Sequence, residues 1–149
     1  MKKIRSIAET IILSGNVIIN DQREIYLLYR NDHLFYETPG GKVQPEECRD
    51  YAAPTIEELA KVARRELQEE VAGIERIVSM SYFKSIEFIT PDDREALAHK
   101  FITRIRGHPY PREKGFDRQK SRWIPLLELY KYPLSPDLKL LVPIVQIIQ

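Results

Sequence analysis

Three glutamates in one predicted helix are the residues of this sequence best suited to chemistry. Residues 55–71 read TIEELAKVARRELQEEV, and their apolar residues recur at the three- and four-residue spacing of an amphipathic helix. At about 100° per residue, Glu70 falls inside the apolar stripe, and Glu66 and Glu69 fall on its edge. Inward-facing carboxylates are costly to bury unless a cation neutralises them. The pattern therefore predicts a site for a hard divalent cation such as Mg²⁺ or Mn²⁺.

The alternative interpretation is a solvated acidic helix edge, in which these acids pair with the basic residues of the same helix. The apolar face on which the acids fall argues against it, as does the glycine loop that precedes the helix. Thr55 and Glu58 are predicted to form a capping box at the helix start, and Gly73 is predicted to lie just past its end. We therefore favour the metal site.

Two separated blocks of the sequence resemble the Nudix box, the signature of Nudix hydrolases. The second half of the box is similar to residues 65–70, RELQEE, and the first half to residues 39–43, PGGKV, followed by Glu47. The flanking segments 24–30 and 122–129 are also similar to Nudix chains. Seventeen residues separate the two halves, about ten more than the family pattern has, so we expect a longer loop before the helix or a longer helix.

The resemblance implies metal-assisted hydrolysis of a diphosphate linked to another group, typically a nucleoside diphosphate derivative. Divalent ions neutralise the diphosphate oxygens and lower the pKa of a bound water. The resemblance makes Glu66 and Glu70 the principal ligands of Mg²⁺ or Mn²⁺, and Glu69 a further ligand or a base that acts through water. The backbone carbonyl of Gly40 would supply one more oxygen, since glycines let the backbone approach metal and phosphates closely.

The resemblance also implies an ion pair between Arg65 and Glu47 that braces the glycine loop against the helix. Arg30, Lys42 and Arg49 are candidates to contact the phosphates of the substrate, because cations near the metal site offset its negative charge. The leading substrate candidates are ADP-ribose and a (d)NTP.

Further candidates are indicated more weakly. Three aromatic residues are candidates to stack on a base, although aromatic residues in strands usually fill the core: Phe35, Tyr36 and Tyr82. Pro91 lies close to where relatives that hydrolyse ADP-ribose often carry a proline. An extra base or ligand is sought among the loop acids, which are Asp92, Asp93, Glu95, Glu113 and Asp117. The histidines lack metal-ligand spacing and are expected to be structural or on the surface; they are His33, His99 and His108.

Composition indicates one domain over residues 1–149, with a net charge of +1 and charges of both signs interspersed. This balance gives no support to nucleic-acid binding, and the expected partner is a small nucleotide, with a homodimer left open. The single cysteine, Cys48, excludes an internal disulfide and agrees with a cytoplasmic location. No uninterrupted apolar stretch is long enough to span a membrane. A strand that begins near Ser6 is favoured over a secretory signal, because Glu9 interrupts the apolar run.

The remaining elements are predicted mainly as strands. Strands are expected at residues 9–20, 24–30, 76–85 and 98–106, and polar loops at 89–96 and 107–120. Gly15-Asn16 is expected to form a turn or bulge. A C-terminal helix is predicted to start at Ser135, with Pro136 at its first position and a kink or an end at Pro143. Strands mixed with two helices fit the α/β/α sandwich with a mixed β-sheet that the Nudix resemblance implies.

Two other functions stay open. One is a catalytically silent Nudix-fold module that senses a nucleotide, which the insertion in the box favours and the intact carboxylates oppose. The other is an enzyme that acts on capped or triphosphorylated RNA ends, which the near-neutral charge and the lack of a basic stripe oppose.

Overall fold

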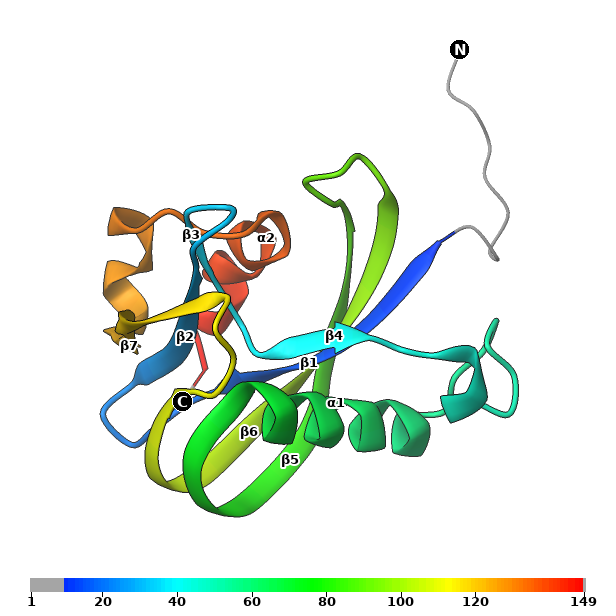
Figure 1. Ribbon diagram of the computed structural model, residues 1–149, viewed down its shortest axis with the longest axis horizontal. Helices are drawn as coiled ribbons and strands as arrows, with labels where there is room; N and C mark the ends of the chain where they lie inside the picture. Colours follow the sequence, from blue (N-terminus) through cyan, green and yellow to red (C-terminus); the bar gives the residue numbers. More distant parts are fainter. Residues whose placement is uncertain (1–9, 149) are drawn as a thin grey trace.

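Two β-sheets and two α-helices make up residues 10–148, the part of the chain that the computed structural model describes (Figure 1). The strands are β1 (Ile11–Ile18), β2 (Glu24–Arg30), β3 (Phe35–Glu37), β4 (Gly40–Lys42), β5 (Val71–Ile89), β6 (Glu95–Pro111) and β7 (Phe116–Pro125). The helices are α1 (Ile56–Glu70) and α2 (Pro136–Val145), with short 3-10 turns η2 (Pro45–Glu47) and η3 (Leu126–Lys131). The sheets have the orders β4-β1-β6-β5 and β3-β2-β7, and the first is mixed because β1 and β6 run parallel.

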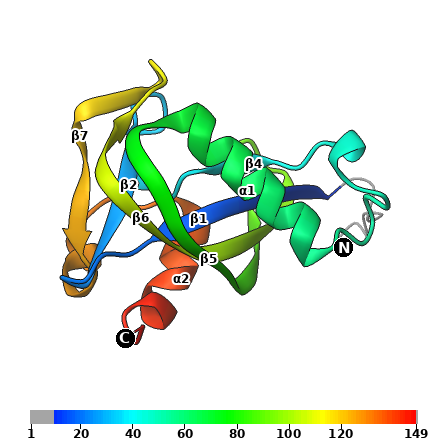
Figure 2. The same ribbon diagram turned by 90° about the horizontal axis from the view of Figure 1, so that it is seen from below.

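The two helices cover opposite faces of the four-stranded sheet, as Figure 2 shows. Successive residues of a strand point to opposite faces. Accordingly, Val17 of β1 packs in one core cluster with Leu138 of α2, whereas the next residue, Ile18, packs in another with Leu67 of α1. This arrangement confirms the α/β/α sandwich with a mixed sheet.

Helix α1 begins as the sequence predicts. Thr55 is its N-cap, and the side chain of Glu58 completes the capping box. The helix ends differently, because Val71 is already extended and starts β5 directly. Gly73 lies just past the helix end, as predicted, but it does not cap the helix; it lies inside β5 with a φ of 82°, where the register with β6 shifts. Of the seventeen residues between Glu47 and Arg65, positions 48–55 form the loop between η2 and α1, and positions 56–64 belong to the helix itself.

Strand β1 runs without a break through Gly15-Asn16, so the predicted turn or bulge there is absent from this strand. Glycine is needed at position 15 for another reason. A Cβ there would lie 2.7 Å from the carbonyl oxygen of Pro39, because the glycine loop passes directly against β1. The prediction of a strand start near Ser6 falls outside the described residues. The predicted strand 24–30 is confirmed as β2.

Strands β5 and β6 form a hairpin much longer than predicted. The predicted loop 107–120 is wrong, because β6 continues to Pro111 and β7 already begins at Phe116. Prolines are tolerated there because β6 no longer pairs with β1 beyond Thr103, and an amide on a free edge needs no partner. The predicted start of the C-terminal helix at Ser135 and Pro136 is confirmed, and Pro143 lies inside the last turn of α2.

In the span 10–148, neither helix has the length and apolar character needed to cross a membrane.

Candidate functional site

The glycine loop and the end of α1 meet at the point that the sequence singles out. The backbone N–H of Gly40 donates a hydrogen bond of 2.7 Å to Oε1 of Glu70. A Cβ on Gly41 would overlap the carboxylate of Glu66, so the missing side chain is what lets this acid lie against β4. The structure therefore places both acids beside the loop whose carbonyl the sequence proposes as a third ligand.

Glu70 is strongly destabilised as an anion in the protein without a cation. Only 7% of the surface of Glu70 is exposed to solvent. Burial first, and then the charges of Glu37 and Glu66, raise the pKa of Glu70 to about 9. Burial also raises the pKa of Glu66. A divalent cation at this place would remove the cost of both charges.

Arg65 links the two halves of the box. Its Nε and Nη2 atoms donate hydrogen bonds of 2.8 and 2.7 Å to the Glu47 carboxylate. This two-point contact fixes the guanidinium and the carboxylate relative to each other. Its Nη1 atom binds Oε1 of Glu66 at 2.8 Å. The guanidinium also holds the pKa of Glu47 below its usual range. The ion pair expected from the sequence is thus present, and the insertion does not separate its partners.

Glu69 does not turn inward as the helical pattern predicts. Its side chain is 51% exposed and pairs with Arg65 at 3.3 Å. A residue on the edge of an apolar stripe turns to solvent when the neighbouring sheet does not extend over it. Its proposed role as a ligand or base therefore needs movement of its side chain or a bridging water.

The residues present fit a hard divalent cation, although they are not arranged as a finished cage. Among residues 10–148, no three His, Cys, Asp or Glu side chains already surround a common point. Arg65 holds Glu66, and the Gly40 N–H holds Glu70. The charge of Glu113 still repels both carboxylates, so a cation would stabilise them. Carboxylate and carbonyl oxygens are also the ligands that Mg²⁺ and Mn²⁺ prefer.

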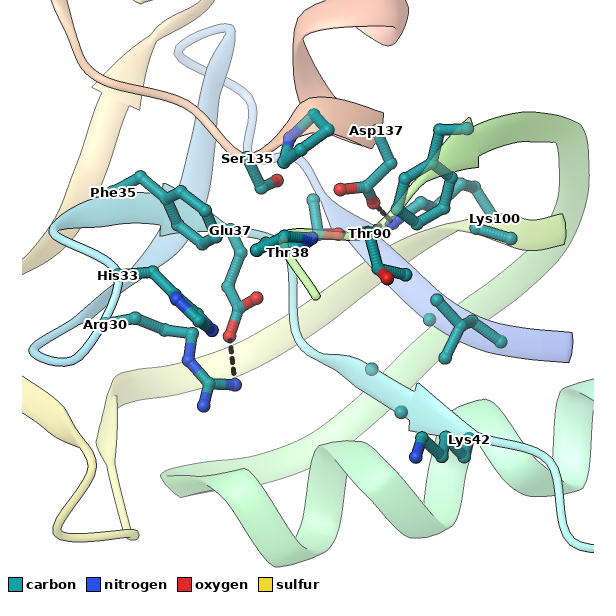
Figure 3. Close-up of a pocket in the computed structure, with 18 of the residues that line it drawn as sticks. Arg30, His33, Phe35, Glu37, Thr38, Lys42, Thr90, Lys100, Ser135 and Asp137 are labelled. Carbon is teal, nitrogen blue, oxygen red and sulfur yellow. Dashed lines mark hydrogen bonds and ion pairs between the residues drawn. The ribbon is translucent and has the colours of Figure 1, made fainter. Parts of the chain in front are cut away.

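A cavity of about 260 Å³ opens beside the glycine loop (Figure 3). Four residues considered from the sequence in connection with the substrate line it, namely Arg30, Phe35, Lys42 and Pro91. Gly40 and His33 also line it, whereas Glu66 and Glu70 do not. The cavity therefore borders the glycine loop of the proposed metal site and contains two of the cations and one of the aromatic residues proposed for the substrate.

A buried polar network forms another wall of this cavity and was not anticipated from the sequence. Nζ of Lys100 on β6 donates to Oγ1 of Thr38 at 2.7 Å and to Oδ2 of Asp137 at 2.6 Å. Burial opposes ionisation of Asp137, but the Lys100 charge lowers the pKa of Asp137 below its usual value. The hydroxyl of Ser135 is buried beside Asp137, whose pKa it also lowers, and it makes no other hydrogen bond within the described part of the chain. The available signals were a lysine at an alternate position of β6 that is otherwise occupied by Ala96, Ala98 and Ile102, and an acid after Pro136.

Glu37 is a further acid that the sequence reasoning missed. It precedes the glycine loop, and its carboxylate pairs with Nη1 of Arg30 at 3.3 Å, as Figure 3 shows. Burial raises the pKa of Glu37 to about 7, against the opposing charge of Arg30. Glu37 thus lines the cavity, and its charge also raises the pKa of Glu70.

Several predicted residues lie elsewhere. Arg49 is exposed in the loop before α1 and does not line the cavity. Tyr36 is buried in the core, and the Tyr82 hydroxyl lies 2.9 Å from Nδ1 of His99. Of the three aromatic candidates, only Phe35 reaches the cavity.

Among the loop acids, Glu113 acts on the site. Its charge raises the pKa of both Glu66 and Glu70. Asp117 instead accepts the backbone N–H groups of Gln119 and Lys120 in its own turn. The others lie at the tip of the β5–β6 hairpin or at the start of β6, and they are Asp92, Asp93 and Glu95.

Comparison with known proteins agrees with this geometry. The family model described as the NUDIX domain matches residues 13–143. MutT from Aliivibrio salmonicida or Vibrio cholerae has a solved structure that is 25% identical, with a TM-score of 0.64 and coverage of 92% of this chain and 94% of that one. MutT Nudix hydrolase from Burkholderia pseudomallei is 20% identical, with a TM-score of 0.67 and coverage of 90% and 96%. A Nudix hydrolase from Nitrosomonas europaea is 14% identical, with a TM-score of 0.68 and coverage of 92% and 88%. No curated protein matches the chain by sequence.

Proposed function

The chain belongs to the Nudix family of pyrophosphohydrolases, and on this premise we propose that it hydrolyses a nucleoside diphosphate linked to another moiety. ADP-ribose and a (d)NTP are the leading candidates. The observation that carries the proposal is the buried Glu70 carboxylate, held against Gly40 beside Glu66 and without an ion pair to any cation among residues 10–148.

Glu66, Glu70 and the Gly40 carbonyl would hold Mg²⁺ or Mn²⁺. When bound, the cation would neutralise the diphosphate oxygens and lower the pKa of the attacking water. Arg65, through its two-point contact with Glu47, holds the segment that follows the glycine loop against α1. Either Glu69 or Glu113 would accept the proton of that water.

The cavity supports a nucleotide as the substrate. Arg30 and Lys42 would offset phosphate charge, and Phe35 offers a flat apolar surface against which a base can stack. The Lys100–Asp137 pair and the buried Ser135 hydroxyl would meet polar groups of the nucleoside. The wall combines these polar groups with apolar side chains such as Leu13 and Phe88, and small-molecule pockets combine the two in the same way.

The test is turnover of a panel of ADP-ribose, dinucleoside polyphosphates, nucleotide sugars and (d)NTPs, each with Mg²⁺ and with Mn²⁺. We expect metal-dependent release of a nucleoside monophosphate from at least one class, and loss of this release in Glu70→Gln. Tight ligand binding without metal and without turnover of any member would instead identify a nucleotide-sensing module and overturn the proposal.

A further inference from the structure

Asn16 on β1 touches every element that builds the proposed metal site. Its backbone N–H donates to the Pro39 carbonyl at 2.8 Å, and its side-chain Nδ2 lies 3.4 Å from the same oxygen. Nδ2 also donates to the Ala63 carbonyl of α1 at 2.9 Å. The hydroxyl of Thr103 on β6 donates to Oδ1 at 2.9 Å, which fixes the orientation of the amide.

The partners of Asn16 are adjacent to the proposed metal ligands. Pro39 immediately precedes Gly40. Ala63 lies three residues before Glu66 and seven before Glu70, so all three share one side of the helix. One amide group therefore spans the gap between the loop that supplies a carbonyl and the helix that supplies two carboxylates.

The position of Asn16 would otherwise favour an apolar residue. Asn16 is fully buried, and Ile12 and Ile18 occupy the same face of β1 toward α1. The Ala63 carbonyl can accept its usual helical hydrogen bond without help. Burying an amide for little added stability is costly. A role in positioning the glycine loop and α1 explains why a buried amide occupies this place.

The backbone on either side reinforces this contact. A Cβ on Gly40 would lie 2.6 Å from Cα of Gly15, so the loop and β1 are already at the closest distance that two backbones allow. The loop is thus fixed on β1, and the Asn16 side chain is the group on β1 that contacts both the loop and the helix.

We propose that Asn16 is a positioning residue that sets the distance between the glycine loop and the carboxylates of α1, and thereby the affinity of the metal site. This inference rests on the proposed function for its metal. It does not require that the substrate be known.

The test is Mn²⁺ binding, followed by the electron paramagnetic resonance of free Mn²⁺ without substrate. Asn16→Leu is combined with Thr103→Val, so that no buried hydroxyl is left without its partner. Ser14→Ala is the matched control, because the Ser14 hydroxyl is also buried on β1 and donates to a carbonyl of α1, that of Leu59, at 2.7 Å. Unlike Asn16, its side chain makes no hydrogen bond to the loop.

We expect the double variant to bind Mn²⁺ about tenfold or more weakly than the wild type, and Ser14→Ala to bind it like the wild type at a comparable loss of thermal stability. Mn²⁺ affinity that is unchanged in the double variant, or lowered equally in Ser14→Ala, would reduce Asn16 to a packing role and overturn the inference. Failure of the wild type to turn over any substrate would count against the proposed function alone, because the binding measurement does not depend on it. If the double variant does not fold, Thr103→Val with Asn16 retained tests the same amide orientation by the same measurement, and wild-type affinity there would overturn the inference.

Discussion

Oε1 of Glu70 accepts a 2.7 Å hydrogen bond from the backbone N–H of Gly40, thirty residues away in the sequence. This contact joins the end of α1 to the glycine loop and orients a buried carboxylate that has no ion-pair partner in the described part of the chain. Because one carboxylate oxygen is engaged by the loop, the other is left to meet a cation. The contact therefore defines where the proposed metal site lies.

Glu70→Gln separates the catalytic role of this acid from its cost to stability. We expect turnover to fall by several orders of magnitude, because a ligand charge is lost while the shape is kept. In metal-free protein the melting temperature should rise, since a buried carboxylate with a pKa of about 9 is removed. Enzyme assays and thermal unfolding check the two effects, and full activity of the variant would exclude Glu70 from the mechanism.

The same acid predicts a pH dependence for the metal-free wild type. The unfolded chain releases the Glu70 proton near its ordinary pKa of 4.5, whereas the folded protein keeps it until a pH of about 9. The folded state thus binds more protons between these values, and stability should fall as the pH rises through this window. The free energy of unfolding, measured by urea denaturation at intervals of about one pH unit from pH 5 to pH 9, checks this decline in stability. Glu70→Gln should show a flatter profile, and equal slopes would contradict the assignment.

Gly41→Ala should damage the metal site without damaging the fold. The added Cβ would overlap the Glu66 carboxylate, which must then move, while the backbone at position 41 needs no left-handed conformation. We expect metal affinity to fall by roughly 10–100-fold. Gly115→Ala is the control, because a Cβ there meets no atom within 4 Å. Titration with Mn²⁺ measures both, and equal affinities would show that Glu66 is not a ligand.

The Arg65–Glu47 pair should be energetically coupled. A double-mutant cycle with Arg65→Ala and Glu47→Ala is expected to give a coupling energy on the order of 1 kcal/mol, because the contact has two points and both side chains are partly buried. The exposed Lys131–Glu128 pair is the matched control, with an expected coupling close to zero because solvent screens it. Unfolding by urea measures both cycles. Arg65→Lys should behave like Arg65→Ala, since lysine cannot make the two-point contact.

The Lys100–Asp137 pair should stabilise the cavity wall at neutral pH. The folded pKa of Asp137 lies below its ordinary value of 3.8, so its contribution is present above that value and is lost as the pH falls below it. Asp137→Asn should cost about 3–5 kcal/mol, because a buried ammonium loses its countercharge. Adding Lys100→Met should recover most of that loss. Unfolding by acid of the wild type, Asp137→Asn and the double variant checks this. If stability falls with decreasing pH in Asp137→Asn as it does in the wild type, the assignment to Asp137 is refuted.

Much of the site was predictable because it depends on local spacing. The capping box at Thr55, the burial of Glu70 and the Arg65–Glu47 pair all follow from residues on one helix or from two matching motifs. The errors have physical causes. Glu69 lies on the edge of the stripe, where helical phase alone does not decide exposure, and the prolines of residues 107–111 fall where β6 has lost one neighbour.

The sequence by itself determined the family, the amphipathic helix and the acids that it carries, because a repeat of 3.6 residues and a loop of small residues are local properties. Only the tertiary structure decided what surrounds the glycine loop and the cavity beside it. Glu37, Asn16, Lys100 and Asp137 come from four different elements, and their contacts depend on how the strands are ordered and paired. Such neighbours are set by the packing of sheets and helices, which no spacing along the chain records.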